Sequence, residues 1–119
     1  MERDPSLDHL LGLNDTRAVI DEAGYWVKFR VARVPLTPER PHGLTYSLTL
    51  HAPDNVRLAG FDNAHAPPAP GVGARSRLAH DHRHRFRTVS AYDYNDAEAL
   101  MSDFWRLVES VMRELGAWK

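Results

Sequence analysis

The chain contains no cysteine, which excludes disulfide bonds and thiolate metal sites and removes any need for an oxidising compartment. No apolar run approaches the ~18–20 residues that a membrane-spanning helix needs. The N-terminal stretch MERDPSLDHL lacks the basic and apolar regions of a signal peptide. We therefore expect a cytoplasmic protein that makes no membrane contact.

Familiar catalytic and nucleic-acid-binding motifs are also absent from the sequence. It contains no Gly-rich phosphate loop, nucleophile elbow or zincin motif, and nothing that resembles a helix-turn-helix or a zinc finger. The net charge of −1 gives no general attraction to nucleic acid. That total hides an uneven distribution, because residues 75–87 form a basic band and residues 93–119 an acidic tail.

What the chain does have is enough apolar sequence for one packed core. Its 119 residues are 43% hydrophobic, which indicates a single domain over residues 1–119. Alternation of apolar and polar side chains predicts strands at 16–20, 25–34, 44–51, 56–62 and 84–89. Residues 1–14 are expected to be a flexible start or a short helix, and the Pro- and Gly-rich residues 64–79 a long loop.

The C-terminal segment carries the strongest helix pattern. Asn95 is the expected N-cap, with Glu98 three residues later, and Gly116 suits the position just past the end. The apolar stripe at helical spacing consists of Leu100, Phe104, Leu107, Val108, Val111 and Leu115. The sequence therefore predicts an α+β fold, an antiparallel sheet of four to five strands with this helix packed on one face.

The most chemically loaded segment is His80-Asp81-His82-Arg83-His84. In an extended segment the three histidines share one face, because side chains alternate with period 2. Such a row can act as general acid and base, bind a metal through neutral imidazoles, or be a solvated strand edge. The metal interpretation is weakened because Asp81, the natural carboxylate partner, points the other way.

A second polar motif, Asp62-Asn63-Ala64-His65, follows the strand predicted at 56–62. Asp and Asn at a strand end are often turn formers, since their side chains bond nearby backbone. The functional alternative is that Asp62 or Asn63 orients a histidine, or that His65 joins the other histidines across the loop.

The basic band supplies candidate phosphate ligands: Arg75, Arg77, Arg83, Arg85 and Arg87. A solvated polar surface is the alternative interpretation. Metal-free RNA cleavage needs a base for the 2′-hydroxyl, an acid for the leaving oxygen and cations for the phosphate. Histidines and arginines together supply all three.

The order of these motifs resembles one known family. An extended GYWVKFRV, a proline break, PHGLTYSLTLH, GFDNAH, DHRH, a Y-D-Y step and a final helix are similar to the TumE toxins of bacterial toxin–antitoxin pairs. The resemblance covers about residues 15–115, and the matching site positions are Asp62, Asn63, His65, Asp81, His82 and His84. It implies a growth-inhibiting toxin encoded beside a helix-turn-helix antitoxin. The Pro- and Gly-rich residues 66–74 depart from the pattern by lengthening the gap between the two motifs.

Our first hypothesis is a metal-independent ribonuclease toxin, with His82 and His84 as the acid–base pair and no cofactor. The alternatives are an inhibitor that binds RNA or protein without cleaving it, and a regulatory domain that binds metal through His80, His82 and His84. The expected partners are RNA and the antitoxin, and the apolar residues Trp118 and Leu7–Leu13 could build a homodimer.

Overall fold

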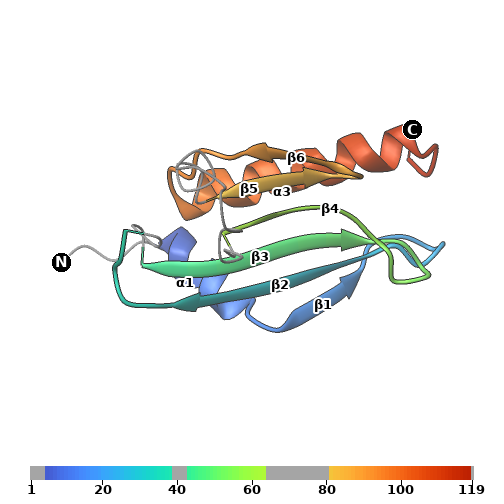
Figure 1. The fold of residues 1–119 in the computed structure, drawn as a ribbon. Helices are drawn as coiled ribbons and strands as arrows, with labels where there is room; N and C mark the ends of the chain where they lie inside the picture. The colour runs from blue at the N-terminus through green and yellow to red at the C-terminus, as the bar shows by residue number, and fades with distance from the viewer. Residues whose placement is uncertain (1–4, 39–42, 64–80, 119) are drawn as a thin grey trace.

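The computed structural model describes residues 5–38, 43–63 and 81–118. Within these residues it contains one antiparallel sheet of six strands, which lie in sequential order, and two helices (Figure 1). The elements are α1 (Pro5–Gly12), β1 (Thr16–Val19), β2 (Trp26–Arg33), β3 (Leu44–His51), β4 (Arg57–Asp62), β5 (His82–Arg85), β6 (Thr88–Ala91) and α3 (Ala97–Glu114). The predicted α+β class is confirmed, with six strands in place of four to five.

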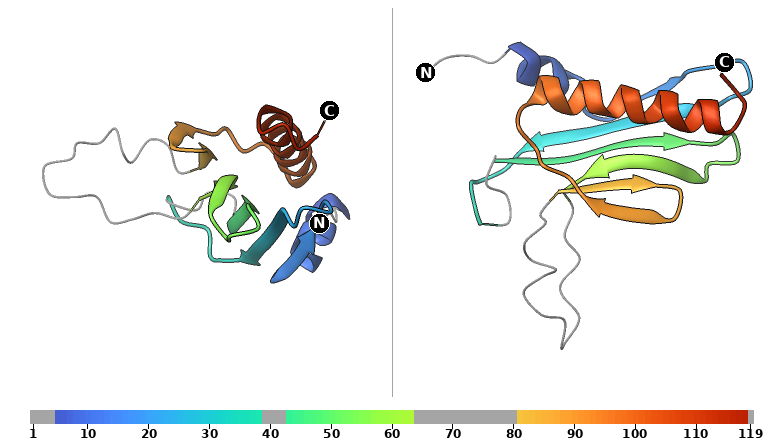
Figure 2. Two further views of the ribbon diagram at one scale, coloured as in Figure 1. Left: turned by 90° about the vertical axis from the view of Figure 1, so that its right-hand side faces the viewer. Right: turned by 90° about the horizontal axis from the view of Figure 1, so that it is seen from above.

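Both helices lie on the same side of the sheet (Figure 2). Alternation sends one set of strand side chains towards them, including Phe29 of β2, Leu48 of β3 and Phe61 of β4, each at most 4% exposed. From α3, Phe104 packs edge-on against Phe29, with ring centroids 5.5 Å apart. This layer is the core, and α1 contributes the fully buried Leu10.

The opposite side of the sheet is covered by no helix within the described residues, and we refer to it as the open face. Strand register and alternation assign to it the following side chains of β1–β5: Arg17, Trp26, Lys28, Arg30, Thr45, Ser47, Thr49, His51, Asp62, His82 and His84. Most of these side chains are polar or basic. The sheet thus separates an apolar layer from a polar surface built by residues distant in sequence.

The helix α3 follows the predicted stripe, with two corrections. Its N-cap is Asp96, not Asn95, and the Asp96 carboxylate accepts a 2.7 Å hydrogen bond from the Ala99 amide. Both residue types cap helices well, so the sequence could not choose between neighbours. Leu115 is the C-cap and is 42% exposed, so the buried stripe ends before it. Gly116 follows with a φ of 77°, as predicted for the position after the helix.

The single strand predicted at 84–89 is wrong. The chain turns at Phe86 and Arg87, so that β5 and β6 form a hairpin with Arg85 opposite Thr88. Phe86 adopts a φ of 52°, a conformation that favours glycine, and its amide donates a 2.6 Å hydrogen bond to the Leu58 carbonyl. A phenylalanine gives no turn signal in the sequence, which explains the error.

Three further sequence predictions concern the N-terminal segment, the long loop and membrane contact. The N-terminal segment contains the short helix α1. The long loop predicted at 64–79 lies outside the described residues. None of the helices in the described ranges combines the length and apolar character that spanning a bilayer requires.

Gly60 of β4 is required by a close approach of the neighbouring strand. A Cβ at this position would lie 2.5 Å from the Leu48 carbonyl oxygen and 3.0 Å from Thr49 Cγ2. We expect Gly60→Ala to lower the free energy of unfolding by about 1–3 kcal/mol, as measured by urea denaturation, because the backbone must shift. The control is Gly12→Ala, where no atom lies within 4 Å and little loss is expected. Equal stability of the two variants would contradict this explanation.

Candidate functional site

Three predicted site residues meet on the open face, where Asp62 of β4 lies beside His82 and His84 of β5. His84 Nε2 is 2.8 Å from Asp62 Oδ2, and His82 Nδ1 is 3.8 Å from Asp62 Oδ1. The two imidazole centroids are 6.4 Å apart. The side chains are mostly enclosed, with 13% of Asp62, 25% of His82 and 16% of His84 exposed. We call these three residues the Asp–His cluster.

Strand register explains this arrangement. Asp62 pairs with His82, and Gly60 pairs with His84, so that all three functional side chains project from the same face. The site is therefore assembled by strand pairing between β4 and β5.

His84 Nε2 is a buried atom with an unusual environment. Its separation from Asp62 Oδ2 is that of an ion pair, yet no well-aligned hydrogen bond reaches it from the described residues. The short separation nevertheless places the imidazole directly against the carboxylate.

Two further residues border the Asp–His cluster, and the sequence analysis did not single them out. Arg57 Nη1 is 4.0 Å from Asp62 Oδ2, and its side chain is 48% exposed. Ser47 of β3 is the register partner of Asp62. No sequence pattern connects these residues with the histidines, because only strand pairing brings them together.

Asn63 and Asp81, also predicted for the site, have their side chains bonded elsewhere. Asn63 Nδ2 donates to the Leu44 carbonyl at 2.6 Å, and its Oδ1 accepts from the Tyr46 amide at 2.9 Å. Asp81 is buried and accepts a short hydrogen bond from the Tyr46 hydroxyl. Asn63 thus ties the end of β4 to β3, and Asp81 ties the start of β5 to the core.

The buried tyrosines around Asp81 titrate abnormally. Burial raises the pKa of Tyr46 far above its ordinary value of 10.0, and the hydrogen bond to Asp81 adds to the effect. Burial likewise raises the pKa of Tyr92, whose hydroxyl donates a 2.6 Å hydrogen bond to Asp103. Both phenols stay protonated in the folded protein and serve as hydrogen-bond donors.

Three of the predicted arginine ligands, Arg83, Arg85 and Arg87, are described, and none of them lies with the histidines. Arg83 and Arg85 alternate with them in β5 and project to the helix side of the sheet. Arg85 forms a 2.7 Å ion pair with Glu114 and a hydrogen bond to Ser110 of α3. Arg83 lines a cavity of about 250 Å³ between the hairpin and α3. Arg87 lies exposed in the β5–β6 turn.

The remaining predicted site residues are His65, Arg75, Arg77 and, for the metal alternative, His80. All four lie outside the described residues. Among the residues that are described, no group of three or more His, Cys, Asp or Glu side chains is arranged to hold a metal ion.

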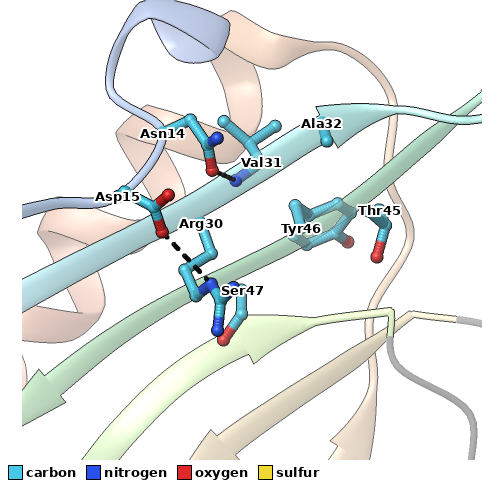
Figure 3. A pocket seen from close by; sticks show the side chains of 8 residues that line it. All are labelled: Asn14, Asp15, Arg30, Val31, Ala32, Thr45, Tyr46 and Ser47. Carbon is cyan, nitrogen blue, oxygen red and sulfur yellow. Dashed lines mark hydrogen bonds and ion pairs between the residues drawn. The ribbon is translucent and has the colours of Figure 1, made fainter.

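The open face also contains a cavity of about 320 Å³, whose lining includes Ser47, the register partner of Asp62 (Figure 3). It is lined by Asn14, Asp15, Arg30, Val31, Ala32, Thr45, Tyr46 and Ser47. Asp15 Oδ1 is 3.4 Å from Arg30 Nε, and Asn14 Oδ1 accepts a 2.9 Å hydrogen bond from the Val31 amide. These contacts fix the turn before β1 against β2 and give the cavity one of its walls.

Chemically, the Asp–His cluster combines the residue types of general acid–base catalysis. Two imidazoles on one surface can take a proton from one atom and give a proton to another, and a carboxylate can hold one ring in place. Arg57, the exposed arginine beside the cluster, can attract an anion.

Comparison with known proteins identifies a family. The model of the family described as toxin TumE matches residues 11–112, which include all of β1–β6 and most of α3. No curated protein and no solved structure matches the chain.

Proposed function

The chain belongs to the TumE toxin family, and from this premise we propose that it inhibits growth as a metal-independent endoribonuclease whose catalytic residues are His82 and His84. Membership of the family makes the protein the toxin of a toxin–antitoxin pair, with an antitoxin as its partner. The reaction and its substrate are our proposal.

The observation that carries the proposal is the placement of two imidazoles around one carboxylate on the open face. The ring centroids are 6.4 Å apart. A phosphate between the rings could therefore be within reach of both, since each proton transfer needs a separation of about 3 Å. Asp62 orients His84 through its 2.8 Å contact.

The proposed step is an internal transfer within RNA. One imidazole accepts the proton of the 2′-hydroxyl, and the 2′-oxygen forms a bond to phosphorus. The bond from phosphorus to the 5′-oxygen breaks, and the other imidazole, protonated, gives its proton to that oxygen. The products are a 2′,3′-cyclic phosphate and a 5′-hydroxyl, with no change of oxidation state and no other reactant.

The phosphate needs a cation, and the geometry favours Arg57 over the arginines of β5. Arg57 is exposed and approaches Asp62, whereas Arg85 is paired with Glu114 on the other side of the sheet. An arginine beside the cluster would stabilise the charge that develops on the phosphate oxygens.

The test is incubation of the purified chain with end-labelled RNA in the presence of EDTA. We expect cleavage to persist with chelator and to leave 2′,3′-cyclic phosphate ends, since histidines supply both proton transfers. The His82→Ala/His84→Ala double variant should lose this cleavage. Because the variant is purified in the same way as the wild type, its loss of activity also excludes a contaminating nuclease as the source of cleavage.

Two results would contradict the proposal. Loss of cleavage with EDTA and its return with zinc or manganese would favour metal-assisted chemistry. If the chain binds RNA and stops growth but does not cleave RNA, the alternative function is favoured, an inhibitor that binds without catalysis.

A further inference from the structure

The open face carries cations that the proposed catalytic step does not use. Arg17, Lys28 and Arg30 come from β1 and β2 and share this face with the Asp–His cluster. Two carboxylates are paired on this face: Asp15 lies beside Arg30, and Asp62 lies beside His84. The surface of α3, on the other side, carries Glu98, Asp103, Glu109 and Glu114. Arg83, Arg85, Arg106 and Arg113 lie on the helix side, where ion pairs with Glu114, Asp103 and Glu109 hold three of them.

Register connects these cations with the cluster in two rows. Arg30 pairs with Ser47, Ser47 with Asp62, and Asp62 with His82. In the next row, Lys28 pairs with Thr49, Thr49 with Gly60, and Gly60 with His84. Neighbouring strands are about 4.8 Å apart, so Arg30 and Lys28 lie about 10 Å from the strand of Asp62. Consecutive nucleotides of one extended strand can bridge that separation.

The cavity on this face lies at the start of the first row. Its volume of about 320 Å³ is at the small end of ligand pockets. Thr45 and Ser47 provide hydroxyl groups in its wall, and Figure 3 shows Ser47 beside Arg30 and Thr45 farther along β3. Arg30 is held by Asp15 and is still 64% exposed, so that a phosphate can approach it.

We infer that the open face binds a single strand of RNA that runs across β2, β3 and β4, with one nucleoside in this cavity and its phosphates on Arg30 and Lys28. The inference rests on the proposed function for the identity of the ligand. Single-stranded RNA fits because its bases can turn out of a stack and enter a cavity, whereas those of a duplex cannot. The path delivers the next phosphate to the Asp–His cluster.

The experiment measures binding separately from cleavage. The probe is a short fluorescent oligoribonucleotide with 2′-O-methyl groups, which the proposed chemistry cannot cut. Its affinity for the full chain is measured by anisotropy at several salt concentrations. Arg30→Gln and Lys28→Gln are each expected to weaken binding about three- to tenfold at low salt, and each should lower the slope of log K against log salt by about 0.7.

The matched control is Arg106→Gln, an exposed arginine of α3 on the opposite side, which should bind the probe like the wild type. Equal affinity of the Arg30 and Lys28 variants and the wild type, or equal binding of a duplex of the same sequence, would overturn the inference. So would an absence of probe binding.

Cleavage of unmodified RNA, followed in parallel, distinguishes the two proposals. Cleavage that needs the histidines but ignores Arg30 and Lys28 contradicts the binding path alone. Binding that depends on Arg30 and Lys28 in a chain that never cleaves RNA contradicts the ribonuclease proposal and retains the path.

Discussion

Alanine at His84 is expected to abolish growth inhibition and to reduce RNA cleavage by about 10²–10⁴-fold, the contribution typical of a positioned acid or base. His84 combines the shortest contact to Asp62 with a buried Nε2 atom that has no aligned hydrogen bond within the described residues. Growth after induction and cleavage by the purified variant are the two measurements. Asp62→Asn, which keeps the shape but removes the charge, should give a smaller loss, because it loosens the ring without removing it.

The control for this prediction is His9→Ala. His9 is exposed on α1, on the helix side of the sheet, and its loss should leave both toxicity and cleavage unchanged. Thermal unfolding of the His84 variant at the wild-type temperature would show that the fold is intact. A His84→Ala chain that is fully toxic at equal expression would exclude this residue from the catalytic step.

The Tyr46→Phe substitution is expected to lower the free energy of unfolding by about 2–3 kcal/mol. The change removes the hydroxyl that donates to Asp81, and a buried carboxylate that loses a hydrogen bond is costly. Because Asp81 directly precedes β5, the loss also loosens the start of the strand that carries His82. Denaturant titration at neutral pH measures the change. Asp81→Asn, which keeps an acceptor oxygen, should cost less.

The stability of the protein at alkaline pH provides an independent test of the hydrogen bond between Tyr46 and Asp81. The pKa of Tyr46 is raised in the folded protein, so its contribution to stability is complete below the ordinary tyrosine pKa of 10.0 and is lost as pH rises above it. The slope expected from this group is about 1.4 kcal/mol per pH unit. Tyr46→Phe should remove that part of the alkaline loss. An unchanged slope, or a variant within about 0.5 kcal/mol of the wild type at neutral pH, would contradict the assigned role.

The regular parts of the fold could be predicted from the sequence because their patterns are local. The alternation of Leu44, Tyr46, Leu48 and Leu50 gave the bounds of β3, and the apolar stripe gave α3. The hairpin of β5 and β6 could not be predicted, because its turn uses Phe86 where glycine or asparagine would signal it. Adjacent capping residues, Asn95 and Asp96, likewise leave the helix start ambiguous by one position.

The candidate site was predictable in part. Asp62, His82 and His84 were identifiable as reactive residue types at strand ends. Their contact depends on the register of β4 and β5, which no local pattern encodes. The same limit applies to the cations: Arg83 and Arg85 are close to the histidines in sequence but alternate to the other face. Arg30 and Arg57 are distant in sequence but lie on or beside the open face.

The most direct test of the central claim is the mapping of RNA 5′ ends in cells within minutes of inducing the toxin. If the Asp–His cluster cleaves RNA, new 5′-hydroxyl ends should appear with the wild type. None should appear with the His82→Ala/His84→Ala variant at equal expression. Growth arrest by the wild type without new ends, or the same new ends with the double variant, would contradict it.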